Sequence, residues 1–559
     1  MKLDAQTAFY CFGLKQKYME KNQDLDKNIQ NDDKTVQNQQ QAQDEQGIPD
    51  LFLPIRNYIA SKTPQNPKIK IAIIVLMFAL CALLFSNILQ AQFSAMQKVI
   101  LSVVMFIICS ETARAIMNWD GFYGLIIFKD RHTLSWIDRQ AKRYEQIWTA
   151  LCDIGLVLGY GFFSWLMISQ DQKSNKTRLV TMYVGGILAL FLFSTFVSPI
   201  AALVINSMLF SSTDTASATS QLNDALGTYK QTQIDLSFIG IDTSINPIAL
   251  FVMLVVLVFG LAGSVYFSLL MYAVIIFPKI LVSVVSFLTS LVGVGEFNQN
   301  DLPAPGGSPI LPGINLPLVE GIIALASVLI VHEMSHGLLA RIADVKLDSA
   351  GVVLFGLIPF GAFVEPDEKQ MSKIKKYEEN RILVAGSASN ILLSIISFFA
   401  LTTIVFLTYD LRSEGYVVDS GNLPKGVIIQ KIAGVQYYGQ NLSLAPNTQV
   451  EIITDEETFF RTTDENGKIG INMNYVNKNA SGFSFKYKSG YGWIEFVLNT
   501  LGLMFAINMF VGMINLLPLP LFDGNRLMLN AIGDGKLAFA ISALCAGSFI
   551  VNMLPWIFK

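Results

Sequence analysis

The chain has 559 residues, of which 52% are hydrophobic and only 15% are charged. Soluble domains carry about 25% charged residues, so this composition predicts a membrane protein. The formal net charge of -3 at pH 7 gives no indication of nucleic-acid binding. The five cysteines form no CxxC pair, so neither a disulfide framework nor a cysteine zinc site is expected.

The first 68 residues are polar, and residues 23–46 are rich in Gln, Asn and Asp. Such a stretch cannot bury enough apolar surface to offset the entropy that it would lose on ordering. We therefore expect residues 1–68 to be a disordered cytoplasmic tail, and we expect no secretory leader there.

Most of the remaining chain consists of apolar runs that are long enough to cross a bilayer, which takes about 20 residues. These runs are Ile69–Leu89, Val99–Met117, Ile147–Ile168, Val180–Ser207, Leu250–Ile276, Leu316–Leu339, Ile382–Thr408, Ile494–Leu517 and Leu537–Ile557. A further run, Ile280–Val294, is shorter and fits either a span or an interfacial helix. The expected fold is a polytopic α-helical membrane protein with about 8–10 transmembrane helices.

Basic residues predict how the chain is oriented. Residues 69–295 form an N-terminal group of helices, whose loop 119–146 carries Lys129, Arg131, Arg139, Lys142 and Arg143. The segment 369–381 carries Lys369, Lys373, Lys375, Lys376 and Arg381. Because short loops rich in Lys and Arg stay on the cytoplasmic side, we expect a multi-pass protein of the cell membrane with both segments cytoplasmic. The polar loop 210–246, nearly free of Lys and Arg, is expected on the other side.

Residues 409–491 have the composition of a soluble insert. Short strands are expected at 426–431, 450–454, 468–475 and 483–488, with turn signals such as Asn466-Gly467 between them. This pattern predicts a small β-rich domain on the extracytoplasmic side. The insert divides a C-terminal core into residues 312–408 and 492–559.

Two of the three histidines stand four residues apart in Val331-His332-Glu333-Met334-Ser335-His336. Positions four apart share one face of a helix, so His332 and His336 can bind one metal ion. Glu333 is adjacent and can act as general base on an attacking water. With 369–381 in the cytoplasm, this site lies toward the cytoplasmic end of its helix. The third histidine, His132, lies in a basic loop and is interpreted as a surface residue.

A catalytic zinc usually has three protein ligands, and no other histidine is within a plausible span, so the third should be a carboxylate. Asp523 is the best candidate, since it follows Pro518 and Pro520, which break the helix at the end of an apolar run. An ionisable residue beside broken backbone at membrane depth indicates a functional site. The alternative is a loop aspartate that caps the next segment; the nearby HExxH motif favours the ligand.

These residues resemble the site-2 proteases, which are zinc metalloproteases that cut inside the membrane. The HExxH helix matches, and Asn515-(x)7-Asp523-Gly524 is similar to the family's Asn-Pro-Asp-Gly motif. Gly386-Ser387-Ala388-Ser389-Asn390 is similar to its Gly-x-x-x-Asn motif, although members commonly have Pro where this chain has Ser387. The resemblance covers residues 311–559 and is closest to archaeal multi-spanning members.

The resemblance implies an intramembrane zinc endopeptidase that acts on transmembrane helices of other proteins in the lipid bilayer. It implies one catalytic Zn²⁺ bound by His332, His336 and Asp523, and a PDZ-like fold for the insert. By analogy, Asn515 or Asn390 would supply or orient a donor to the developing oxyanion. An interhelical hydrogen bond is the alternative role for each asparagine. The oligomeric state stays open.

The segment 357–366, which follows the HExxH helix, combines Pro, Gly and aromatic residues and predicts a re-entrant β-hairpin. Its free edge can pair with an unwound substrate, whereas an ordinary cytoplasmic loop is the alternative. Among other polar residues in apolar runs, Glu111 and Arg114 are expected to pair with each other. Asp153 is expected to be a helix-end or interface acid.

Two other functions use parts of the same pattern. A protease-derived membrane chaperone would have lost turnover, but His332, Glu333, His336 and Asp523 are all present. A metal transporter would use the same ligands as a transport site, but it would be expected to show internal repeats and further acidic pore residues. We see no repeat, so the sequence favours the protease.

Overall fold

The computed structural model of the protein describes residues 52–192, 247–294, 316–476 and 491–555, apart from residues 94, 172–175, 357, 413 and 425, together with a few positions between these ranges. Expectations that concern residues 1–51 and most of the loop 210–246 lie outside the described residues. The chain divides into two compact units. The first comprises Met1–Phe196, Ala225–Leu392 and Ile507–Lys559, and the second comprises Val197–Asp224 and Leu393–Ala506.

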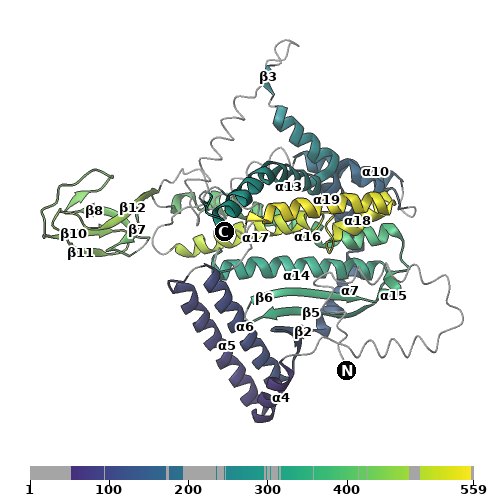
Figure 1. The fold of residues 1–559 in the computed structure, drawn as a ribbon, viewed down its shortest axis with the longest axis horizontal. Helices are drawn as coiled ribbons and strands as arrows, with labels where there is room; N and C mark the ends of the chain where they lie inside the picture. Colours follow the sequence, from purple (N-terminus) through teal and green to yellow (C-terminus); the bar gives the residue numbers. More distant parts are fainter. Residues whose placement is uncertain are drawn as a thin grey trace. The chain divides into compact units, whose positions relative to one another are not determined.

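Eight helical segments in the described part of the chain are long and apolar enough to cross a membrane, which agrees with the polytopic fold expected from composition. Seven are the helices α5 (Pro67–Gln90), α6 (Ala95–Met117), α13 (Pro247–Leu291), α14 (Leu318–Ile342), α16 (Lys376–Leu407), α17 (Gly492–Ile514) and α19 (Gly535–Met553). The eighth is Glu145–Ile168, in which α8 (Glu145–Tyr160) passes through a short 3-10 turn into α9 (Trp165–Ile168). Figure 1 labels these helices, apart from α8 and α9, and colours them by their position in the sequence.

Two expected boundaries differ from the structure. The runs at 250–276 and 280–294 belong to one 45-residue element, α13, which is kinked at Gly260, where φ is 69°. The run expected at 180–207 is described only as α10 (Lys176–Leu192), and its remainder lies outside the described residues. Apolar composition predicts that a segment is buried in lipid, but it does not show where one helix ends and the next begins.

Part of the expected disordered tail is helical, which corrects the boundary at residue 68. Leu53–Lys62 forms the helix α4. Its Ile59 packs against an apolar cluster on α5 and α6, and Arg56 Nη1 lies 3.7 Å from Glu111 Oε2. These tertiary contacts order a segment whose own composition is too polar to predict it.

Glu111 and Arg114 pair with each other, as expected. Arg114 Nη1 lies 2.8 Å from Glu111 Oε1, and both side chains are buried. The same carboxylate accepts a 2.7 Å hydrogen bond from the backbone N–H of Gly124. This contact attaches the turn between the strands Asp120–Phe122 and Leu125–Lys129 to α6, so the pair has a structural role.

A four-stranded antiparallel sheet lies beside the HExxH helix α14 (Figure 1). Its strand order is β1 (Asp120–Phe122), β2 (Leu125–Lys129), β5 (Leu347–Phe355) and β6 (Ile358–Pro366). The strands β5 and β6 form the expected hairpin, which begins ten residues before the predicted segment (357 against 347). The strands β1 and β2, and the helix α7 (Arg131–Arg143), come from the basic segment 119–146, where we expected only a loop.

The insert between α16 and α17 is β-rich, as expected. Its sheet has the order β11 (Thr458–Thr462), β10 (Gln449–Thr454), β8 (Ile428–Ile432), β7 (Gly415–Gly421) and β12 (Ile471–Val476), and the short β9 (Val435–Gln436) pairs with β8. The strands β8, β10 and β12 correspond to three of the predicted strands. The fourth, at 483–488, lies outside the described residues except for Tyr487. Its PDZ-like character and its side of the membrane stay predictions.

The buried core of the insert should stabilise the insert independently of α14. Ile452 on β10 is fully buried against Val418 and Ile429, so Ile452→Ala should destabilise the insert by about 2–5 kcal/mol. Hydrogen exchange on the full-length protein should show faster exchange in β8 and β10 but not in α14. The exposed Val435→Ala serves as the control and should change little. Equal acceleration in α14 would contradict the division into two units.

Candidate metal centre

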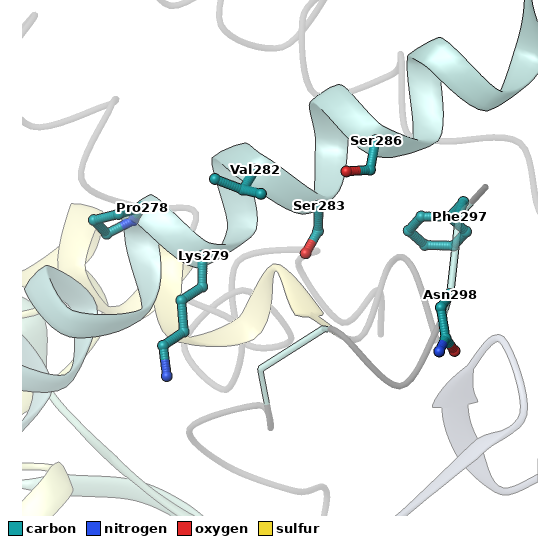
Figure 2. Close-up of a pocket in the computed structure, with 7 residues that line it drawn as sticks. All are labelled: Pro278, Lys279, Val282, Ser283, Ser286, Phe297 and Asn298. Atoms are coloured by element: carbon teal, nitrogen blue, oxygen red, sulfur yellow. The ribbon is translucent and has the colours of Figure 1, made fainter. Parts of the chain in front are cut away.

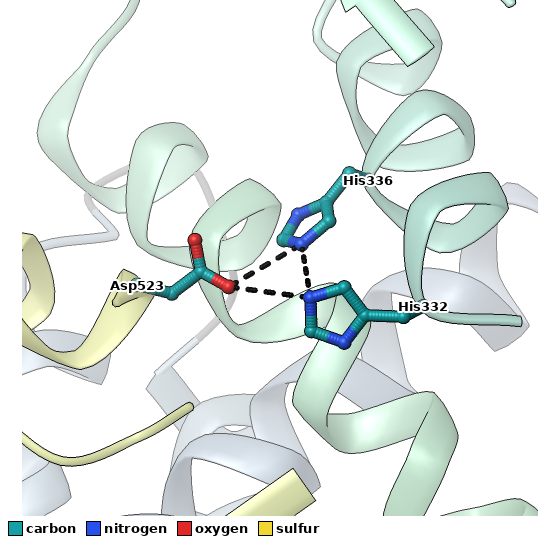
Figure 3. Close-up of side chains that lie close together, drawn as sticks. All are labelled: His332, His336 and Asp523. Carbon is teal, nitrogen blue, oxygen red and sulfur yellow. Dashed lines mark hydrogen bonds and ion pairs between the residues drawn. The ribbon is translucent and has the colours of Figure 1, made fainter. Parts of the chain in front are cut away.

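The helix α14 carries two imidazoles that meet at their outer nitrogens. His332 and His336 lie one helical turn apart, and their Nε2 atoms are 3.1 Å apart. Both rings face the carboxylate of Asp523, as Figure 3 shows. The spacing of the motif on a regular helix is enough to produce this arrangement.

Asp523 is the first residue of α18 (Asp523–Ile532), which follows the broken backbone after α17. Its Oδ2 lies 3.3 Å from His336 Nε2 and 3.6 Å from His332 Nε2. Burial disfavours a charged carboxylate, but the two imidazoles, His336 foremost, hold the pKa of Asp523 below its usual range. As a carboxylate, Asp523 can supply an anionic ligand to a metal ion.

The three donor atoms fit a zinc ion. They all lie within 4.8 Å of one another, and in the described part of the chain they form the one group of three or more His, Cys, Asp or Glu side chains that has this property. Ligands about 2.0–2.1 Å from a tetrahedral zinc are separated by about 3.3 Å. The observed separations of 3.1, 3.3 and 3.6 Å agree with this value. Two histidines and one carboxylate also leave a fourth position open.

The helix α16 contacts each imidazole at Nδ1, the ring nitrogen on the side away from the donor atoms. His336 Nδ1 donates a 2.7 Å hydrogen bond to the carbonyl oxygen of Ile382. Because a carbonyl can only accept, Nδ1 carries the hydrogen and the lone pair of Nε2 points toward Asp523. His332 Nδ1 lies 3.1 Å from the side-chain amide of Asn390, which is fully buried.

The amide of Asn390 can orient His332 in the same way. Its Oδ1 is buried without a hydrogen-bond partner. Turning the amide end for end would bring that oxygen to the Nδ1–H of His332 and satisfy both groups. Asn390 thus contacts the edge of the imidazole that is remote from the donor atoms. This contact matches the interhelical hydrogen bond that we considered as an alternative to an oxyanion donor.

Asn515 lies on the other edge of the same imidazole. It follows α17 directly, and its Nδ2 is 3.4 Å from His332 Nε2. Its backbone carbonyl accepts a 2.8 Å hydrogen bond from Gly524, the residue after Asp523. The two asparagines singled out in the sequence therefore flank one histidine, but only Asn515 lies beside the donor atoms.

Gly386 on α16 lies against both imidazoles. A Cβ atom at this position would be 2.5 Å from His332 Cε1 and 2.5 Å from His336 Nε2. Since real Cβ atoms essentially never approach other atoms that closely, any side chain would displace the rings. The glycine of the Gly-x-x-x-Asn segment therefore leaves room for the donor atoms, and Asn390, one turn later, reaches His332.

Gly524 has a similar steric role on the opposite side of the site. A Cβ atom there would be 2.1 Å from the carbonyl oxygen of Leu516. The absence of a side chain lets the loop between α17 and α18 close on itself, so that Asp523 reaches the histidines. Pro518 and Pro520 lie within this loop, as expected from the helix break.

Glu333 lies between the histidines and the hairpin. The backbone of Val364 on β6 lies close to its carboxyl group. One turn later, Gly337 lets β6 approach α14, because a Cβ atom there would be 2.9 Å from Val364 Cγ1. The candidate base therefore borders both the three donor atoms and the edge strand of the sheet.

The helix-end position expected for Asp153 was wrong, because the residue lies in the middle of α8, whereas a position at the membrane interface stays a prediction. It is buried on α8 and pairs with Arg381 through contacts of 2.7 and 2.9 Å. Arg381 Nη2 also lies 2.9 Å from Asp171 Oδ2. An acid at membrane depth signals that a partner exists. The sequence did not identify that partner, which is 228 positions away.

The sequence also did not indicate that Tyr160 contributes to the site. Its hydroxyl donates a 2.8 Å hydrogen bond to the carbonyl oxygen of Leu516, in the loop that leads to Asp523. A tyrosine in an apolar run gives no sequence signal of such a contact. His132, by contrast, is exposed at the start of α7, as expected for a surface residue.

A separate cavity of about 380 Å³ lies along the second half of α13 (Figure 2). Lys279, Ser283 and Ser286 are its polar residues on that helix. It contains none of the three metal-binding candidates and has Lys279 as its one titratable lining residue. This cavity is therefore distinct from the candidate metal centre.

The segment that carries the three donor side chains resembles a known protein family. Residues 320–553 match the sequence family described as Peptidase family M50. An uncharacterized protein of Methanocaldococcus jannaschii is 28% identical over 240 residues, which cover 40% of this chain and 60% of the relative. The matched segment includes α14, Gly386, Asn390 and Asp523. This segment of the chain is therefore similar to Peptidase family M50, the site-2 protease family.

Proposed function

We propose that the protein is an intramembrane zinc endopeptidase that hydrolyses peptide bonds in or near the transmembrane helices of other membrane proteins. The observation that carries this proposal is the convergence of His332, His336 and Asp523 beside Glu333, within the segment that matches the M50 family. Two histidines, one carboxylate and an open position form a ligand set typical of catalytic zinc.

The mechanism follows from the positions of the side chains. A zinc ion bound by the three donors would polarise the scissile carbonyl and acidify the attacking water. Glu333 takes a proton from that water as its oxygen attacks the carbonyl carbon, and then delivers the proton to the leaving nitrogen as the C–N bond breaks. Asn515, beside His332 Nε2, is our candidate donor to the developing oxyanion. Asn390 would hold His332 in the required tautomer.

The substrate helix must unwind locally, because its peptide bonds are shielded by their own hydrogen bonds. The strand β6 is the last strand of its sheet, and no further strand pairs with it in the described residues. An edge strand can pair with an extended segment from another chain. We propose that β6 binds the unwound substrate in this way, since its Val364 lies next to Glu333.

The orientation of the chain belongs to the same proposal. The helix α7 and the segment before α16 carry the basic residues expected on the cytoplasmic side. Both lie in the unit that contains the candidate metal centre. We propose that the site faces the cytoplasm of a cell-membrane protein and that the insert is an extracytoplasmic, PDZ-like domain.

A protease-derived chaperone without turnover would use the same site, so only activity separates it from the enzyme. A metal transporter would need successive ligand groups along its path. The single ligand group found among the described residues favours the protease over the transporter.

Replacing the base should separate metal binding from turnover. The purified Glu333→Gln protein should keep about one zinc but cut a model transmembrane substrate at least about 100-fold more slowly, because it lacks the proton acceptor. His336→Ala should lose both zinc and cleavage. The exposed His132→Ala is the matched control and should lose neither. Full activity of Glu333→Gln would refute the mechanism, and absence of zinc from the wild type would refute the site.

The steric role of Gly386 predicts an effect of a single methyl group. Gly386→Ala should weaken zinc binding by about 100-fold or more, because its Cβ would push both imidazoles away from the shared position. Gly547→Ala on α19 is the matched control, since no atom lies within 4 Å of a Cβ at that position. Zinc affinity can be measured by competition with a chelator. Unchanged affinity in Gly386→Ala would show that the rings bind metal in another arrangement.

Substrate pairing along β6 can be tested by cross-linking. In a Glu333→Gln background, Phe360→Cys on β6 should cross-link to a substrate that carries one cysteine near the scissile bond. Tyr123→Cys, in the turn between β1 and β2 at the opposite edge of the sheet, should not. The native cysteines of the described residues are buried and should stay silent. Equal cross-linking from both positions would argue against β6 as the docking strand.

A further inference from the structure

The helix α8 lies outside the segment that matches the M50 family, yet it contacts both backbone stretches that hold the candidate metal centre. One stretch is the loop from α17 to α18, which carries Asp523. The other is the first part of α16, whose Ile382 carbonyl accepts the hydrogen bond from His336. The inference below rests on the proposed function, because it concerns the zinc that this site would bind.

The first contact is made by a tyrosine hydroxyl. Tyr160 is 3% exposed and donates its hydrogen bond to the carbonyl oxygen of Leu516, which is 0% exposed. Leu516 lies in irregular backbone, where carbonyl groups lack the partners that a continuous helix would provide. Gly524 also lies against this carbonyl group of Leu516, because a Cβ atom at Gly524 would be 2.1 Å from its oxygen. The hydroxyl of Tyr160 therefore fixes the point at which the Asp523 loop closes.

The second contact is a buried ion cluster. Asp153 on α8 and Asp171, shortly after α9, both bind the guanidinium of Arg381. Arg381 is adjacent to Ile382, so the cluster fixes the backbone whose carbonyl sets the tautomer of His336. Paired, hydrogen-bonded charges of this kind hold one geometry at membrane depth.

Small residues bring α8 close enough to make both contacts. A Cβ atom at Gly155 would lie 2.4 Å from the Cβ of Ala388 on α16. A Cβ atom at Gly159 would lie 2.7 Å from Leu516 Cδ1. Glycines four apart form one face of the helix, which is the arrangement that lets two membrane helices pack closely.

We infer that α8 is a positioning element of the metal centre. Tyr160 holds the loop of Asp523, and Asp153 holds the backbone that orients His336. Neither residue touches the metal position itself. The affinity of the site for zinc consequently depends on side chains that the family-matched segment does not contain.

The test uses Co²⁺, which takes the place of zinc and absorbs visible light according to its coordination geometry. In the full-length protein in detergent, Tyr160→Phe should weaken Co²⁺ binding by about 10-fold and alter the visible spectrum, because Asp523 is held less firmly. Tyr183→Phe is the matched control. Its hydroxyl also donates to a backbone carbonyl, that of Phe162, in the N-terminal helices. It should bind Co²⁺ as the wild type does.

The ion cluster has its own matched pair of variants. Asp153→Asn should also weaken Co²⁺ binding by about 10-fold. Glu111→Gln removes the buried partner of Arg114, remote from the site, and should leave Co²⁺ binding unchanged even where it lowers the Tm. Wild-type affinity in both Tyr160→Phe and Asp153→Asn would overturn the inference. Equal losses in the test and control variants would overturn it as well. A wild type that binds no Co²⁺ would instead defeat the proposed function itself.

Discussion

Three donor atoms from separate parts of the chain must meet within about 3.3 Å of one another, in surroundings where an unpaired polar group is costly. Helix geometry alone satisfies this demand for His332 and His336. It cannot satisfy it for Asp523, which has to be brought to the histidines by a break in the membrane-spanning structure. The remainder of the unit around the site can be understood as the means of holding that break in one shape.

Close backbone approach is the main device. Gly386 allows α16 to lie against both imidazoles, and Gly524 allows the loop before α18 to fold against Leu516. Both positions are closed to any side chain. Steric exclusion thus explains why a glycine stands next to the aspartate and why another stands four residues before Asn390. The departure at Ser387 removes neither of these glycines nor any donor atom.

The sequence predicted those features whose cause is local. The spacing of HExxH requires only a regular helix, and the helix break before Asp523 follows from Pro518 and Pro520. The strands β1 and β2 were missed because five basic residues between 119 and 146 concealed the short apolar run Leu125–Phe128. Tyr160 and Asp153 could not be assigned either, because their partners lie in α16 and in the loop after α17. Such pairings depend on the tertiary fold, and one sequence carries no direct record of them.

The contacts of α8 indicate that this N-terminal helix holds the metal centre in place rather than admitting substrate. A helix that binds both the Asp523 loop and the backbone behind His336 cannot move freely without disturbing the donor atoms. Any opening that admits a substrate should then take place elsewhere in the unit. The β6 side of α14 is consistent with this requirement, because there Glu333 lies beside an edge strand. Rigidity on the α8 side and access on the β6 side would let the metal centre keep its geometry while a substrate segment is exchanged.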